Sequence, residues 1–168
     1  MNIPQQILVS KTRGKKRHYT IDMGAHGKAT IQYESAFCKN AVGFINDEQW
    51  KFVRKGFWKK ELEITAQQSP YTKTNIKLGW GSKLSLRGPD NNTYYFKAVG
   101  WWRRRWVWFD SAGKQLMEIK SNGFSRSRRG LVTQNQSWTP VLSWLLLVGW
   151  FQLVIWEEQT AAAAAAAA

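Results

Sequence analysis

The chain has 168 residues, with 25 Lys and Arg against 11 Asp and Glu, so its net charge is +14. Hydrophobic residues make up 43% of the sequence and aromatic residues 14%, including 11 Trp, which excludes an intrinsically disordered chain. The single cysteine, Cys38, excludes a disulfide scaffold and a cysteine-based zinc cluster. A chain of roughly 150 residues buries enough surface for one hydrophobic core, so we expect one domain.

The charge is unevenly distributed along the chain. Residues 1–129 hold all 25 basic residues and 9 of the 11 acidic ones, a net charge of +16. Residues 130–168 contain only Glu157 and Glu158 and have a net charge of −2. The first residues lack the cationic start and apolar run of a secretory signal, so the expected location is the cytoplasm.

Residues 1–16 are interpreted as a flexible basic arm, and the strand-like pattern begins at Arg17. From there to about residue 136, short runs rich in aromatic and β-branched residues alternate with polar residues and turn signals. About ten to twelve strands spaced at ~8–12 residues are expected, which is typical of a sandwich or barrel. The body, residues 17–136, is therefore predicted to be all-β.

Two hairpins stand out within this body. Residues 106–120 place two strand patterns on either side of a turn from Asp110 to Gly113, where glycine is free to adopt positive φ. Residues 83–87 and 93–99 flank a second turn signal, residues 88–92. Both pairs predict antiparallel strands with one buried face.

The C-terminal segment is different in kind. Residues 141–156 contain only two polar residues, Ser143 and Gln152, and Thr139-Pro140 is a favourable helix start. A helix over 140–156 is apolar on all sides and must be enclosed by protein or by lipid. Its length of about 24 Å is short of the ~30 Å of a membrane core, which favours burial inside the protein, with a transmembrane or interfacial helix as alternatives. The predicted core residues of this helix are Trp144, Leu146, Trp150 and Val154, and residues 157–168 form a low-complexity tail rich in alanine.

An all-β body followed by one apolar terminal helix suits a closed barrel with the helix through its middle. The aromatic strand at residues 94–99, the hairpin at 106–119 and the terminal helix together resemble the tubby C-terminal-like superfamily, which includes the phospholipid scramblases and the LURP-one-related proteins. The resemblance implies a closed antiparallel barrel of about 12 strands around a central hydrophobic helix. The chain lacks the acidic calcium loop and the Cys-rich cluster of scramblases, so calcium-driven scrambling is not implied.

Catalytic motifs are missing from the sequence. It contains no G-x-S-x-G, H-E-x-x-H, Walker or G-x-G-x-x-G pattern. Cys38, His18 and His26 are too few for a metal centre, and a lone cysteine beside Phe37 is typical of a buried apolar side chain. We therefore expect a protein that is not an enzyme and that uses no metal or cofactor.

Four basic clusters point to an anionic partner. The third joins basic and aromatic residues within six positions, because Arg103, Arg104 and Arg105 lie between two tryptophans and Trp106. Anionic phospholipid headgroups at a cytoplasmic membrane surface fit this composition, and the resemblance favours them. Nucleic acid, or membrane anchoring by a transmembrane C-terminal helix, remain alternatives. The candidate contact residues are Arg103, Arg104, Arg105, Arg126, Arg128 and Arg129, with Trp101 and Trp102 as membrane-interface candidates.

Overall fold

The computed structural model describes residues 6–12, 17–34, 40–55, 61–68, 73–77, 83–100, 105–121, 128–134 and 137–166. Within these residues it contains twelve strands, one short 3-10 helix and one long α-helix. In chain order they are β1 (Gln6–Thr12), β2 (His18–Asp22), η1 (Gly24–His26), β3 (Lys28–Tyr33), β4 (Asn40–Ile45), β5 (Glu48–Lys55), β6 (Glu61–Ala66), β7 (Lys73–Lys77), β8 (Lys83–Arg87), β9 (Thr93–Val99), β10 (Arg105–Phe109), β11 (Gln115–Ser121), β12 (Arg128–Gln134) and α1 (Pro140–Ala166).

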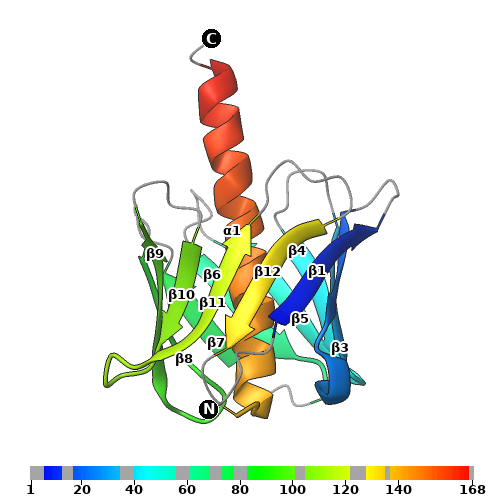
Figure 1. The fold of residues 1–168 in the computed structure, drawn as a ribbon. Coiled ribbons are helices and arrows are strands. Elements are labelled where there is room, and N and C mark those ends of the chain that lie inside the picture. The colour runs from blue at the N-terminus through cyan, green and yellow to red at the C-terminus, as the bar shows by residue number, and fades with distance from the viewer. Residues whose placement is uncertain are drawn as a thin grey trace.

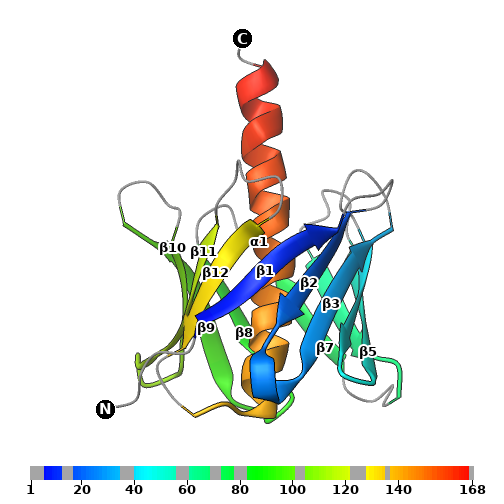
Figure 2. The ribbon, with the colours of Figure 1, turned by 45° about the vertical axis from the view of Figure 1, so that its right-hand side comes forward.

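The strands form one antiparallel sheet in the order β7-β6-β5-β4-β3-β2-β1-β12-β11-β10-β9-β8. Strands that are neighbours in this order are also consecutive in the chain, with one exception: the first strand, β1, pairs with β2 on one side and with the last strand, β12, on the other. The sheet curves around α1 (Figures 1 and 2). We call the end of the sheet at which α1 begins the lower end, and the end from which α1 emerges the upper end (Figure 1).

The strands follow the period-two alternation of the sequence. In β8, Leu84 and Leu86 are buried while Lys83, Ser85 and Arg87 are exposed. Alternate residues of a strand point to opposite faces of a sheet, so the apolar set lines the concave side and the charged set lines the outer side. The predicted all-β body is confirmed.

Both predicted hairpins are confirmed. β10 pairs with β11, and the N–H of Gly113, whose φ is +82°, donates to the carbonyl of Asp110 over 3.1 Å. β8 pairs with β9, and the N–H of Gly88 donates to the carbonyl of Asn92 over 2.8 Å. The turn residues therefore set the register of these two hairpins.

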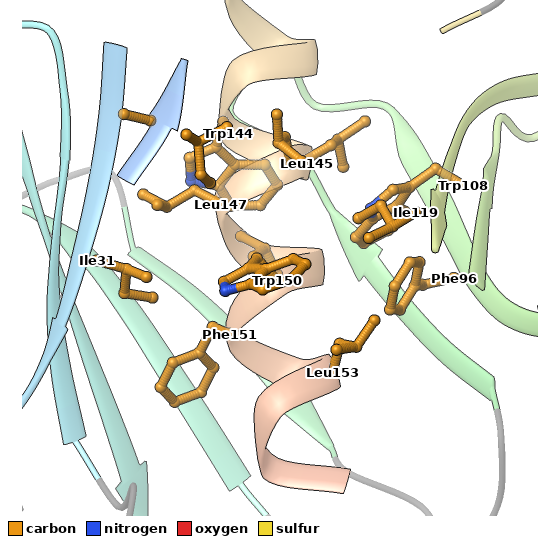
Figure 3. Packing of buried hydrophobic residues seen from close by; sticks show 14 of the residues in the cluster. Ile31, Phe96, Trp108, Ile119, Trp144, Leu145, Leu147, Trp150, Phe151 and Leu153 are labelled. Carbon is orange, nitrogen blue, oxygen red and sulfur yellow. The ribbon is translucent and has the colours of Figure 1, made fainter. Parts of the chain in front are cut away.

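Helix α1 supplies the centre of the core. Residues 142–155 are all buried, on every side of the helix, and they include Trp144, Leu146, Trp150 and Val154. Strands on opposite sides of α1 provide the partners, as Figure 3 shows for Ile31 on one side and Phe96 and Trp108 on the other. Burying each large apolar side chain contributes about 1.5–3 kcal/mol before chain entropy is counted.

Aromatic contacts fix the level of α1 within the sheet. Trp144 meets Trp50 of β5 near the lower end, with ring centroids 6.0 Å apart. About two turns later, Phe151 stacks on Phe52 of the same strand at 4.9 Å. Glycine allows the helix to approach closely, because a Cβ at Gly149 would lie 2.6 Å from Trp108 Nε1.

The two edge strands of the sheet, β7 and β8, lie side by side at the remaining seam. The hydroxyl of Thr74 donates to the carbonyl of Arg87 over 3.3 Å and so joins them. Within the part of the chain that the structure describes, no backbone ladder pairs β7 with β8. The structure thus confirms the predicted antiparallel β-sheet with one C-terminal helix.

Two predicted boundaries are wrong. The expected flexible arm contains β1, which pairs with β2 and β12 in the middle of the sheet and buries Ile7 and Val9. Ile7 and Val9 face inward, but the exposed residue between them, Leu8, is also apolar, so the sequence shows no clean period-two alternation here. The helix continues past Trp156 to the end of α1, because alanine has the highest helix propensity.

By length and composition alone, α1 is able to cross a membrane. In the structure most of its apolar stretch is buried against strands instead. Its first residue, Pro140, and its last part, beginning at Gln159, are exposed.

Candidate anion-binding surfaces

Most of the predicted contact residues cannot be placed. Trp101, Trp102, Arg103, Arg104 and Arg126 lie outside the described residues, as does Cys38. Arg128 and Arg129 begin β12, where the structure describes only the backbone. Arg105, the first residue of β10, is the one predicted contact whose side chain is described.

Arg105 is engaged by a carboxylate on the outer face of the sheet. Its Nε and Nη2 atoms donate to the two oxygens of Glu118 on β11 over 3.0 and 2.6 Å. Lys120 Nζ approaches the same carboxylate at 3.3 Å. The Arg105 hydrogen bonds hold the pKa of the Glu118 carboxyl below its ordinary value. Two cations therefore share one carboxylate, and Arg105 offers less free charge to a ligand than the sequence suggested.

A pair of lysines on β8 and β9 is not neutralised by a described carboxylate in this way. Lys83 of β8 and Lys97 of β9 are directly opposite in the antiparallel register. Both ammonium groups lie near the ring of Tyr95, at 5.3 and 5.9 Å from its centroid. Lys97 Nζ also lies 5.2 Å from the ring centroid of Phe109 on β10. We call Lys83, Lys97, Tyr95 and Phe109 the lysine–aromatic patch.

Within the described part of the chain, the two lysines of the patch have no acidic partner. Neither Lys83 nor Lys97 forms an ion pair with a described carboxylate. Like charges directly opposite in a sheet repel each other, and each cation–π contact offsets this by only about 0.5–1 kcal/mol at an exposed site. A bound anion between the two ammonium groups removes the repulsion, so this pair is a candidate anion site.

The sequence contains a signal for this pair that lies outside the basic clusters. Lys83 and Lys97 are 14 residues apart, so neither belongs to a basic run. They are, however, equally distant from Asp90 at the centre of the predicted turn, and residues equidistant from a hairpin centre become cross-strand partners.

The side chains at the upper end of α1 are tied to the strands. Arg17, next to β2, forms an ion pair with Glu158, and the hydroxyl of Ser121 on β11 donates to Glu157. Arg54 of β5 is half-buried at the same end, and desolvation lowers its pKa from the ordinary value. These contacts hold the helix where it leaves the sheet.

The histidines have structural surroundings. His26 of η1 stacks on Trp138, with ring centroids 5.5 Å apart and planes inclined by 15°. His18 begins β2 and pairs with Gln32 of β3 in the sheet register. Among the described residues, no three His, Cys, Asp or Glu side chains are grouped so as to hold a metal ion.

Comparison with known proteins adds no relative: no family model, curated protein or solved structure matches the chain. The tubby-like resemblance therefore stays a prediction, and the function is argued from the surfaces described above.

Proposed function

We propose that the chain is a non-enzymatic protein that binds anionic phospholipid headgroups at a cytoplasmic membrane surface. The observation that carries the proposal is the lysine–aromatic patch, in which Lys83 and Lys97 face each other without a described acidic partner. Lys and Arg near anionic lipid contribute roughly 1 kcal/mol each to binding. Tyr95 adds a ring with a polar tip, which suits the boundary between lipid and water.

The architecture that we propose for this protein is a closed barrel of the tubby-like kind. The hydrogen bond between Thr74 and Arg87 brings the edge strands together, and closure of β7 on β8 removes the last exposed edges of the sheet. The burial of residues 142–155 supports α1 as the core of this barrel over α1 as a transmembrane anchor. Slow hydrogen exchange of those β7 amides that do not bond to β6 tests closure, and exchange of these amides as fast as in a peptide contradicts it.

Single-stranded nucleic acid is the competing ligand, since cations with an aromatic ring also suit phosphates and stacked bases. We favour lipid because the chain resembles a superfamily that contains phospholipid scramblases. The two ligands are separated by competition at matched salt. Displacement of the protein from vesicles by single-stranded DNA at stoichiometric amounts favours nucleic acid.

Vesicle sedimentation tests the proposal. The double substitution Lys83→Gln and Lys97→Gln is expected to weaken binding to phosphatidylserine-containing vesicles about 30-fold, the equivalent of ~2 kcal/mol. The control removes the same charge at the lower end, by Lys28→Gln and Lys114→Gln, and is expected to bind nearly as well as the parent. Equal binding of the parent to neutral and anionic vesicles overturns the proposal, and an equal loss in the control removes the lysine–aromatic patch as its site.

The predicted contacts at Arg103, Arg104, Arg126, Arg128 and Arg129 remain part of this proposal. Their substitution by Gln in the same assay measures their share of the binding.

A further inference from the structure

Charge is distributed unevenly around the sheet as well as along the chain. Strands β1 to β6 hold five basic and four acidic residues, so their charge is nearly balanced. Strands β8 to β11 hold five basic residues and one acidic residue, and the side chains of all six are described. The five basic residues are Lys83, Arg87, Lys97, Arg105 and Lys120, and the acidic residue is Glu118. Strands β7 and β12 are not counted, because their basic side chains lie outside the described residues.

The five cations of β8 to β11 share the outer face of the sheet. Each of them is next to a buried residue of its own strand; these buried residues are Leu84, Leu86, Phe96, Trp106 and Ile119. Alternate residues of a strand point to opposite faces, so the cations point away from the core. Neighbouring strands lie about 4.8 Å apart, so the four strands form a surface roughly 14 Å wide. We call the surface that carries these five cations the cationic face.

The opposite side of the sheet has no comparable charge. Ile31 of β3 and Phe96 of β9 lie on opposite sides of α1, so the outer face of β3 is turned away from the cationic face (Figure 3). There, Asp22 of β2 and Lys28 of β3 are directly opposite in the register and balance each other. Within the described residues, the molecule thus has one strongly positive side and one nearly neutral side.

Glu118 is the single described carboxylate of the strands that form the cationic face, and it engages two of the five cations. Its oxygens accept from Arg105 over 3.0 and 2.6 Å, and Lys120 Nζ lies 3.3 Å away. The carboxylate is 8% exposed, whereas the Arg105 and Lys120 side chains are 54% and 47% exposed. The two cations therefore face solvent while Glu118 holds back part of their charge.

The aromatic residues of the cationic face favour headgroups over bases as its ligand. Both Lys83 and Lys97 place their ammonium groups over the ring of Tyr95, and Lys97 also lies over the ring of Phe109. Bases of single-stranded nucleic acid stack on open ring faces, whereas these rings already carry cations. Ionic contact with lipid headgroups requires no free ring.

We infer that the protein docks side-on: the cationic face lies against an anionic bilayer, the outer face of β3 is turned toward water, and Glu118 limits the strength of docking. The inference rests on the proposed lipid binding and extends it from one lysine pair to a face of four strands with a defined orientation. Charge complementarity selects the side, because an anionic surface attracts the positive side of the molecule over the nearly neutral one.

Two labelled variants test the orientation. In a Cys38→Ser background, Ser85→Cys places an environment-sensitive fluorophore between Lys83 and Arg87 on the cationic face, and Gln32→Cys places it on the outer face of β3. Both positions are exposed in the middle or second half of a strand. Vesicles contain phosphatidylcholine and phosphatidylserine, with a headgroup-linked nitroxide lipid as quencher. We expect strong quenching and a blue shift at position 85 and neither effect at position 32.

The other outcomes of this experiment overturn the inference in distinguishable ways. End-on docking does not separate the two sides of the sheet, so similar responses at both positions show that the side-on orientation is wrong while lipid binding stands. A response at position 32 alone leads to the same conclusion. If the unlabelled parent fails to sediment with anionic vesicles, the proposed function fails and the inference fails with it. A response at position 85 to DNA, with none to vesicles, identifies nucleic acid as the partner and overturns both.

A second measurement needs no change at Cys38 and tests the role of Glu118. Glu118→Gln releases Arg105 and Lys120, so we expect it to bind phosphatidylserine-containing vesicles about fivefold more tightly than the parent. The control, Glu34→Gln, removes one exposed carboxylate next to β3 and raises the net charge equally, and its affinity is expected to stay close to that of the parent. Thermal melting of both variants is measured first, to establish that they are folded at the assay temperature. An equal gain in both variants, or no gain in Glu118→Gln, contradicts the inference.

Discussion

Trp106 of β10 and Trp156 of α1 stack with their ring centroids 4.2 Å apart and their planes inclined by 17°. Phe96 of β9 extends the stack, with its centroid 5.4 Å from that of Trp106. Trp156 follows the last fully buried residue of α1, Ile155. This stack therefore marks the level at which the helix passes from the core of the protein to its upper end.

Removing the stack is expected to loosen this end of the core. Trp156→Ala should lower the free energy of unfolding by about 2–4 kcal/mol, since truncation of a large aromatic leaves both a cavity and unpaired rings. Trp156→Phe keeps an aromatic ring at the site and should cost less than about 1.5 kcal/mol. Urea unfolding monitored by circular dichroism measures both. A Trp156→Ala variant as stable as the parent would show that the stack contributes nothing.

A charge in the middle of α1 is expected to prevent folding. Leu146 is completely buried, so Leu146→Arg places a guanidinium among apolar side chains with no partner. The control, Ala163→Arg, makes the same change on the exposed end of the helix and should fold normally. The measurement is soluble yield and thermal melting without detergent. A soluble Leu146→Arg protein that melts cooperatively contradicts the buried position of the helix.

Gly149→Ala should destabilise the protein although alanine favours helix. The helix propensity gained is about 1 kcal/mol, but the new Cβ would lie 2.6 Å from Trp108 Nε1 and 2.9 Å from Ile119 Cδ1. Overpacking of this kind costs about 1–3 kcal/mol, so the net change is a lower midpoint of denaturation. The reverse substitution Ala163→Gly, on the exposed helix, should change the midpoint by less. A higher midpoint for Gly149→Ala would place the helix farther from β10 and β11.

The ion pair of Arg105 and Glu118 predicts a pH-dependent stability. Because the folded-state pKa of Glu118 lies below the unfolded value of about 4.3, its contribution is present above that pH and is lost as pH falls through the folded-state pKa. Glu118→Gln should therefore lower the melting temperature at pH 7. The difference between the parent and Glu118→Gln should shrink as the pH falls below that unfolded value. A difference that stays constant from pH 7 to pH 2 would show that the pair does not depend on the ionised carboxylate.

The sequence predicted the parts of this fold that depend on local pattern. The turn at Asp110–Gly113 and the apolar run of α1 are each encoded by residues that are close together in the chain. The hairpin and the helix therefore follow directly from local sequence. The strand β1 was missed because the exposed residue between its two inward residues, Ile7 and Val9, is also apolar, so no clean alternation marks the strand. Its place beside β12 depends on pairing across the whole chain, which no local pattern specifies.

The candidate sites were less predictable than the fold. The basic cluster containing Arg105 was visible in the sequence, but its neutralisation depends on Glu118, which lies opposite only after β10 and β11 have paired. The reverse holds for Lys83 and Lys97, which are isolated in the sequence and adjacent in space. In both cases it is cross-strand register, and not the density of charge along the chain, that determines which cations remain available to a ligand.

The measurement that tests the account most directly is a nuclear Overhauser effect between the indole N–H of Trp108 and the α protons of Gly149. A strong cross-peak is expected in detergent-free buffer, because the Trp108 Nε1 atom lies against this glycine inside the sheet. The same cross-peak should persist when anionic vesicle-mimicking bicelles are added. A missing cross-peak, together with contacts from Gly149 to lipid acyl protons, would contradict the account by placing α1 in the membrane instead of in the core.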